Sequence, residues 1–157
     1  MKRILSCSLV LLIVLCFLCG CENKEDTASV RPETMLKHFA AKSAVIQTEE
    51  ESVLLEDADC QNFRLWVLSC PIMEETKATD ITDWTYRILF CDAEKLTEQD
   101  GVYFLPHTAQ LHTVLIDEER SLIQFDSDTY EVDTRQDRAA DFYEGVRVYR
   151  AGALKTN

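Results

Sequence analysis

The sequence is poor in the residues from which most recognisable active sites are built. Of its 157 residues, only four are glycine and three are histidine. Glycine lets a backbone wrap closely around phosphate groups, but no glycine-rich phosphate loop is present. A Gly-x-Ser-x-Gly elbow and a Ser-x-x-Lys motif are also missing. These absences remove the usual signals for a nucleotide or a serine nucleophile, and we expect no cofactor.

The few possible metal ligands are badly spaced. His107 and His112 would lie on opposite faces of a strand, and zinc usually needs three or four nitrogen or sulfur ligands. A loop near residue 130 has several carboxylates, as a calcium site does, but it lacks the glycine of the sharp turn. Those carboxylates are Asp126, Asp128, Glu131 and Asp133. We therefore expect no metal site.

The N-terminus has the order of segments typical of a secretory signal. Lys2 and Arg3 form a basic start, and residues 4–18 form an apolar run of fifteen. That run is short for a bilayer core of about 30 Å, which favours a signal peptide over the alternative of a membrane-spanning helix.

A cysteine motif follows the apolar run. The segment Leu18-Cys19-Gly20-Cys21 resembles the lipobox of bacterial lipoproteins, in which a small residue precedes the cysteine that is modified. The resemblance implies cleavage before Cys21, a lipid such as palmitate on that cysteine, and retention at the cell membrane on its extracytoplasmic side. It covers about 25 residues and carries no information on the rest.

Three segments are expected from this reading. Residues 1–20 are the lipoprotein signal peptide, 21–31 are the lipidated cysteine with a polar tether, and 32–157 are a single globular domain. The 137 residues left after cleavage suit one domain rather than two.

The mature chain would be strongly acidic. Lys2 and Arg3 leave with the signal, so 14 basic side chains face 28 acidic ones and the net charge is −14. That charge repels nucleic acid and anionic lipid headgroups, so neither is expected as a partner. A solubilising surface explains the acidity better than a site for cations or basic partners.

The first part of the domain contains one predicted helix and two short strands. Pro32 suits the first position of a helix that ends near Lys42. Residues 43–48 and 52–56 flank an acidic stretch and are expected to be strands, with one longer helix as the alternative.

The middle of the chain is rich in residues that favour β-structure. Residues 63–69 and 84–90 predict a central antiparallel hairpin, in which Phe63 pairs with Phe90. Alternation places Leu65 of the first strand and Trp84 of the second on the core face of this hairpin. Further strands are expected in four segments: 101–105, 111–116, 122–125 and 129–133. In the last pair we expect Phe125 to lie opposite Tyr130.

The C-terminal segment predicts a helix. Thr134 is a suitable cap, and Gly145 is a weak point within the helix. An apolar stripe runs along it: Ala139, Phe142, Tyr143, Val146 and Tyr149. The predicted fold class is α+β, an antiparallel β meander with an N-terminal and a C-terminal helix packed on it.

One surface is a candidate for binding. On the hairpin face opposite the core, the pattern places Arg64, Trp66 and Arg87, and arginine and tryptophan often anchor interfaces. The alternative, which we favour, is that a helix covers this face, since large apolar patches are rarely exposed on monomers.

Three cysteines follow the lipidated one. The predicted hairpin makes Cys60 the nearer neighbour of Cys91, and makes Cys60 to Cys91 the one disulfide to consider. Cys70, at the far end of its strand, is expected to be a free thiol. None of the three has a neighbouring basic motif that would make it a nucleophile.

The function expected from the sequence is a non-catalytic binding or accessory module of the cell envelope. We expect a monomer, anchored in the membrane through Cys21, with an envelope protein as a possible partner. One alternative is an exported hydrolase built on scattered carboxylates such as Asp117, Glu118 and Asp126. Another is a small acidic inhibitor or immunity protein.

Overall fold

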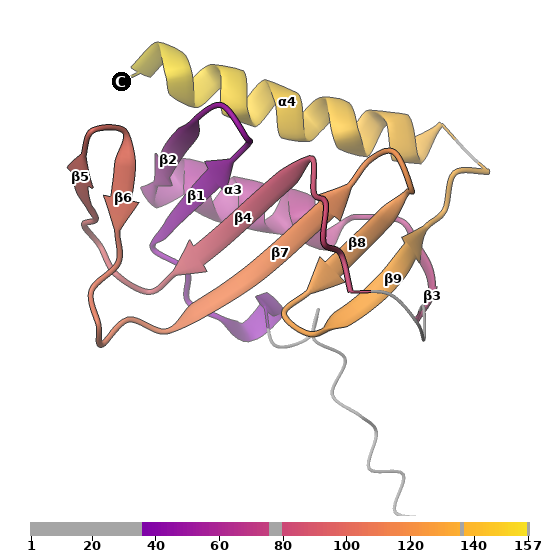
Figure 1. The fold of residues 1–157 in the computed structure, drawn as a ribbon, viewed down its shortest axis with the longest axis horizontal. Helices are drawn as coiled ribbons and strands as arrows, with labels where there is room; N and C mark the ends of the chain where they lie inside the picture. Colours follow the sequence, from indigo (N-terminus) through magenta and orange to yellow (C-terminus); the bar gives the residue numbers. More distant parts are fainter. Residues whose placement is uncertain (1–35, 76–79, 136, 157) are drawn as a thin grey trace, which may run out of the picture. The chain divides into compact units, whose positions relative to one another are not determined.

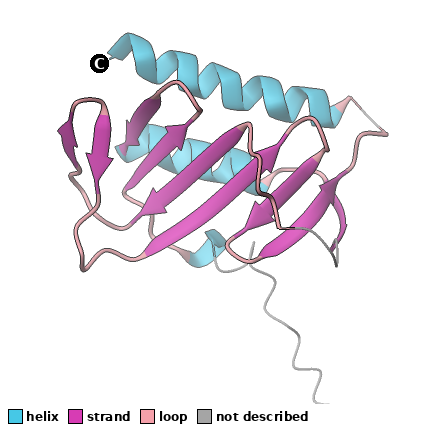
Figure 2. Cartoon of the chain, in the orientation of Figure 1, coloured by secondary structure: helices cyan, strands magenta, loops and turns pink. Residues whose placement is uncertain are grey.

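The computed structural model describes residues 36–75, 80–135 and 137–156, all within the unit Arg31–Asn157. The predicted signal peptide, the lipobox and the tether lie outside these residues. The described part of the chain has an α+β fold, as predicted (Figures 1 and 2). Its main sheet has seven antiparallel strands in the order β2-β1-β4-β7-β8-β9-β3, and β5 and β6 form a separate hairpin.

Most predicted strands are present. The main sheet consists of β1 (Ser43–Gln47), β2 (Ser52–Glu56), β3 (Ile72–Glu75), β4 (Tyr86–Cys91), β7 (Leu111–Asp117), β8 (Leu122–Phe125) and β9 (Asp128–Val132). The predicted strand at 101–105 is β6 (Val102–Phe104), whose partner β5 (Thr97–Gln99) was not predicted, and neither was β3. β5 is fully exposed, so it carries no apolar pattern from which it could be recognised.

The predicted strand at 63–69 is wrong, because these residues belong to helix α3 (Asp57–Leu68). Cys60, Phe63 and Val67 are its buried residues, and their spacing of three and four is helical. Leu65, which the strand pattern placed in the core, is 58% exposed. The composition of this segment favours a strand, but burial of its helical stripe against the sheet decides its structure.

The central hairpin therefore does not form. β4 pairs with β1 and β7, so Phe90 lies opposite Ala44 and His112. Phe63 still meets Phe90, with ring centroids 6.0 Å apart, but across the contact between α3 and the sheet. The predicted register of the last strand pair is also wrong by two residues, since Tyr130 lies opposite Ile123.

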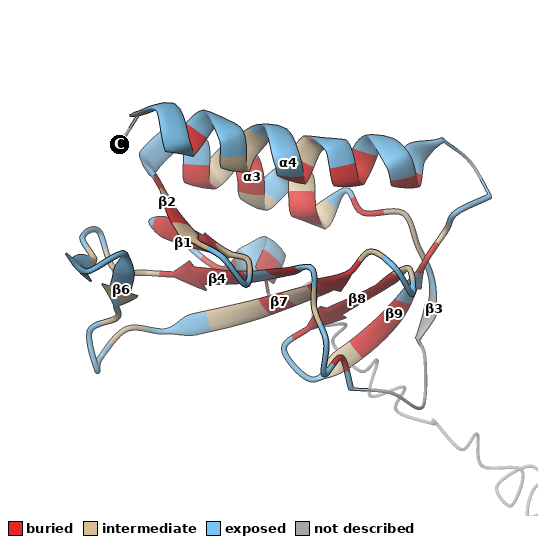
Figure 3. Cartoon of the chain, turned by 45° about the horizontal axis from the view of Figure 1, so that its top comes forward, coloured by how far each residue is buried: buried red, intermediate tan, exposed pale blue. Residues whose placement is uncertain are grey.

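Both long helices lie on one face of the main sheet (Figure 3). Helix α4 (Arg138–Thr156) buries the predicted stripe, with Tyr149 partly buried against the core. From the sheet, Ile46, Ile88, Ile116 and Ile123 are completely buried. The sheet and the two helices thus enclose one hydrophobic core.

The chain enters the domain through a short segment that α3 holds. Residues 36–38 are helical, whereas the predicted helix continues to Lys42, so its C-terminal part is wrong. Leu36 and Phe39 are buried, and Arg64 Nη1 donates hydrogen bonds to the carbonyls of Leu36 at 2.9 Å and Lys37 at 2.8 Å. This segment is therefore held by the burial of its apolar side chains and by the hydrogen bonds from Arg64, and not by a longer run of helical hydrogen bonds.

Candidate functional site

The three residues of the predicted binding surface are not neighbours on one hairpin. Arg64 and Trp66 belong to α3, whereas Arg87 belongs to β4. Arg64 binds the entry segment, and Trp66 is partly buried against the core. The hairpin face on which both were predicted to lie does not form. Arg87 is exposed, and no hydrogen bond or ion pair of its side chain is seen within the described residues.

Trp66 packs against the main chain of α4. Its Nε1 donates a hydrogen bond of 3.1 Å to the carbonyl of Phe142. A Cβ atom at Gly145 would lie only 2.1 Å from Trp66 Cε2. Gly145 is therefore required for this close approach, and it is not merely a weak point in the helix.

The carboxylates considered for a hydrolase are separated by the length of a strand. Asp117 ends β7 and pairs with Leu122, whereas Asp126 lies beside Thr113 at the other end of β8. Four residues of β7 correspond to about 13 Å at about 3.3 Å per residue. The structure therefore brings Asp117 and Glu118 into one turn but leaves Asp126 elsewhere.

A cleft lies beside the turn between β7 and β8. We call it the Trp84 cleft; it has a volume of about 380 Å³ and is lined by Asp83, Trp84, Thr85, Asp117, Glu119 and Arg120. The chain leading into β4 crosses the outer face of the sheet at β7 and β8 (Figure 1), and the Ile81 amide donates to Gln124 Oε1 at 3.0 Å. This crossing brings residues 83–85 next to the turn.

Hydrogen bonds between residues more than thirty positions apart in the sequence hold the two walls of the cleft together. The Thr85 amide donates to the Ile116 carbonyl at 2.7 Å, and the Glu118 amide donates to Thr85 Oγ1 at 3.0 Å. Four residues, 118–121, connect β7 to β8. The last of them, Ser121, adopts the left-handed backbone conformation with φ of 56°. These hydrogen bonds fix the backbone of the turn, and with it the positions of the Cα and Cβ atoms that line the cleft.

Asp117 is the buried centre of this turn. It is only 4% exposed, its Oδ1 accepts the Arg120 amide at 2.9 Å, and its Oδ2 accepts Arg120 Nε. The first bond is the local side-chain bond by which aspartate stabilises turns. The second bond joins the guanidinium to this buried carboxylate. No partner of the Arg120 Nη groups is seen among the described residues.

The cleft thus presents both donors and acceptors around an aromatic ring. Arg120 supplies N–H donors, Asp83 and Glu119 supply carboxylate oxygens, and Trp84 is half-buried. Sequence reasoning placed Trp84 on the core face of the hairpin and did not consider Arg120. The sequence does contain a charge-rich turn with an aspartate three residues before an arginine. The other wall of the cleft, however, comes from residues 83–85, more than thirty positions earlier in the sequence.

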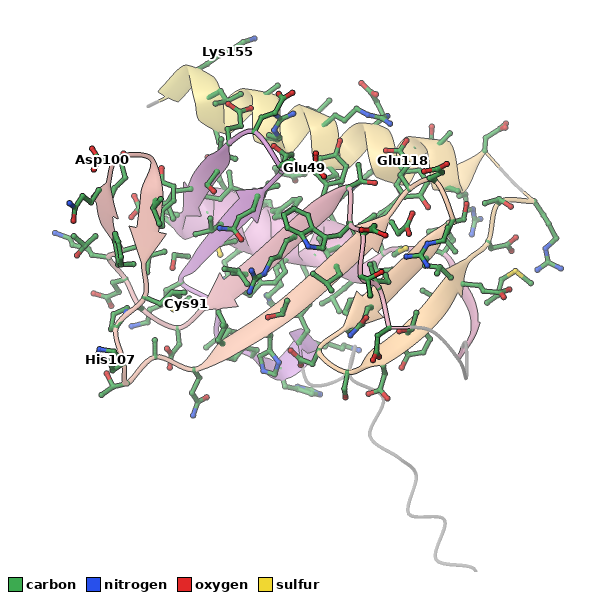
Figure 4. The ribbon with its side chains drawn as sticks, in the orientation of Figure 1. Glu49, Cys91, Asp100, His107, Glu118 and Lys155 are labelled. Atoms are coloured by element: carbon green, nitrogen blue, oxygen red, sulfur yellow. The ribbon has the colours of Figure 1, made fainter. Side chains whose placement is uncertain are left out.

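A second surface depression lies along the first half of α4. It is lined by Glu118, Thr134, Asp137, Ala139, Ala140, Asp141, Tyr143, Glu144 and Arg147. Arg147 forms ion pairs with Glu118 and, at 3.3 Å, with Glu144. Figure 4 shows Glu118 where the turn approaches α4. Burial raises the pKa of the Tyr143 phenol to about 12. The ion pair of Arg147 with Glu118 joins α4 to the turn between β7 and β8.

His107 and His112, whose spacing was judged unsuitable for a metal site, have different surroundings. His112 Nδ1 lies 2.7 Å from Asp126 Oδ2, and the His112 ring packs edge-on against Phe39. His107 is exposed in the loop before β7 (Figure 4). Within the described residues, no group of three or more histidine, cysteine or carboxylate side chains could hold a metal ion.

Of the carboxylates in the suggested calcium loop, two have local partners. Asp126 accepts the Thr113 amide at 2.8 Å and adopts a positive φ of 51° in the turn after β8. Asp133 pairs with Arg135, and hydrogen bonds from that guanidinium and its backbone amide lower the pKa of the Asp133 carboxyl. Both carboxylates thus stabilise local chain structure.

The three described cysteines are free and buried. Burial raises the pKa of the Cys60 thiol to about 11, although the nearby charge of Arg64 lowers it in part. Burial also raises the pKa of Cys70. The prediction of a free Cys70 is confirmed, and the Cys60 to Cys91 disulfide is absent. Thiols with raised pKa values are poor nucleophiles at neutral pH.

Comparison with protein-family models, curated proteins and solved structures found no match. Within the described residues, no helix is both long and apolar enough to cross a bilayer.

Proposed function

We propose that the chain is an exported lipoprotein, attached to the cell membrane through a lipid on Cys21, whose domain is a non-catalytic binding or accessory module of the envelope. The anchor rests on the lipobox-like segment at residues 18–21. The binding role rests on the Trp84 cleft, where we place the ligand.

The observation that carries the binding role is the fixed guanidinium of Arg120. Arginine normally loses much side-chain entropy when it orders around a ligand. Here Asp117, itself buried, already orients the group, while no partner of the two Nη groups is seen in the described part of the chain. Preorganised donors of this kind lower the cost of binding.

The same geometry favours binding over hydrolysis. A carboxylate-based hydrolase needs one carboxyl group as acid and a second as a free base or nucleophile. Asp117 uses both oxygens to hold Arg120 and its amide, and Asp126 is engaged at the other end of β8. Glu118 pairs with Arg147, so all three carboxylates named for the hydrolase alternative have partners within the protein.

Photocrosslinking on intact cells tests this proposal. A photoreactive residue at Glu119 should give a defined adduct, and the same residue at Val148, 60% exposed on α4, is the control position. The Glu119 adduct should be lost in Trp84→Ala. Fatty-acid labelling of the same cultures should mark the protein but not Cys21→Ala.

Two results would contradict the proposal. Equal adducts from both positions, or none from either, would remove the Trp84 cleft as the binding site. Membrane retention of a signal-cleaved Cys21→Ala protein without lipid would remove the lipoprotein anchor.

A further inference from the structure

The charges lining the Trp84 cleft restrict the ligand. Asp83, Asp117 and Glu119 are acidic, and Arg120 is the basic residue of the lining. The excess of negative charge repels anionic ligands such as phosphates and carboxylates. A small cation would instead meet the guanidinium of Arg120. A neutral ligand avoids both penalties.

The polar groups of the cleft are complementary to a ligand that both donates and accepts hydrogen bonds. The Arg120 Nη groups can only donate, whereas the Asp83 and Glu119 carboxylates can only accept when ionised. A hydroxyl group does both, and several neighbouring hydroxyl groups could serve the two kinds of partner at once. Polyhydroxylated molecules therefore match this lining.

Trp84 adds an aromatic surface to these polar groups. The face of an indole ring carries partial negative charge, which attracts the C–H bonds on the apolar face of a sugar ring. The volume of about 380 Å³ lies within the range of about 300–1,000 Å³ that is usual for small-molecule sites. We propose that the Trp84 cleft binds a neutral saccharide. This inference rests on the proposed binding function and specifies its ligand class.

Calorimetric titration of the full chain, solubilised in a detergent without sugar groups, tests the ligand class. The neutral probes are the tetrasaccharide of N-acetylglucosamine, cellotetraose and maltotetraose. The charged probes are oligomers of galacturonic acid, which are anionic, and of glucosamine, which are cationic. At least one neutral probe should bind at least about tenfold more tightly than either charged probe, since a tenfold difference needs only about 1.4 kcal/mol.

Variants locate the binding. Trp84→Ala should weaken the neutral probe at least tenfold, and Glu119→Gln should weaken it several-fold. The matched control is Phe104→Ala, which removes an aromatic ring that is 52% exposed on β6, outside the cleft lining, and should change nothing. Circular dichroism confirms that each variant is folded, and Glu119→Gln keeps the test decisive if Trp84→Ala does not fold.

The outcomes separate this inference from the proposed function. Binding of charged probes alone, or neutral binding that neither Trp84→Ala nor Glu119→Gln weakens, overturns the saccharide inference. Absence of any sugar binding, with the Glu119 crosslink retained, overturns it while the binding module stands. Loss of both sugar binding and the crosslink overturns the two together.

Discussion

Gly145 shows how a single residue can determine the distance between a helix and its neighbour. Alanine normally stabilises a helix by about 1 kcal/mol relative to glycine. At Gly145, however, a Cβ atom would overlap the Trp66 ring, which donates its hydrogen bond to the Phe142 carbonyl. Overpacking of this kind costs about 1–3 kcal/mol. Since the gain offsets part of the cost, we predict that Gly145→Ala lowers the free energy of unfolding by up to about 2 kcal/mol in urea denaturation.

The same helix provides the control. Gly152 also lies in α4, and nothing is within 4 Å of a Cβ atom built there. Gly152→Ala should raise the free energy of unfolding by up to about 1 kcal/mol. Equal effects of the two substitutions would show that Trp66 does not restrict Gly145.

Among the elements, α3 does more than cover the sheet, because it also holds the segment through which the chain enters the domain. Arg64 donates to the Leu36 and Lys37 carbonyls, and Gln61 donates to the Ala41 carbonyl. Hydrogen bonds from a charged group contribute about 1.5–3 kcal/mol. We predict that Arg64→Met opens the segment, so that the lysine-specific protease Lys-C cleaves after Lys37 about tenfold faster.

Arg87→Met is the matched control for that cleavage. Arg87 is exposed, without a side-chain partner seen among the described residues, so its loss should leave the rate of cleavage after Lys37 unchanged. Comparing the cleavage rates of these two variants shows whether the two arginines of the predicted binding surface differ in role. A similar rate in Arg64→Met and in the unaltered protein would contradict the role assigned to Arg64.

At the scale of the whole molecule, buried acidic groups make stability depend on alkaline pH. The pKa of Cys60 rises from 9.0 to about 11 on folding, and that of Tyr143 rises from 10.0 to about 12. The unfolded chain therefore loses these protons at lower pH than the folded chain does. Stability is fully present below pH 9 and falls as pH rises to about 12.

Urea denaturation in reducing buffer across this range checks the prediction. Cys60→Ala should flatten the fall between pH 9 and about 11, and Tyr143→Phe should flatten it between pH 10 and about 12. Both variants can shift the absolute stability, so the slope against pH is the decisive quantity. Unchanged slopes in both would show that these groups are not protected in the folded state.

The sequence by itself determined the parts of the fold that depend on local periodicity. Short runs rich in apolar residues define β7 and β8, and a stripe repeated every three to four residues defines α4. The α+β class follows from these elements, because each must bury its apolar side against another. The lipid anchor also rests on a local motif, and it remains a prediction.

Only the tertiary structure decided that residues 63–68 are helical and that the Trp84 cleft exists. The composition of α3 favours a strand, yet Cys60 and Phe63, three residues apart, lie on opposite faces of a strand and reach the core together with Val67 only from a helix. The cleft forms because β4 pairs with β7, which sets Tyr86 opposite Ile116 and so brings Trp84 beside Arg120. Such pairing depends on which distant segments bury each other best, and no local pattern of residues records that choice.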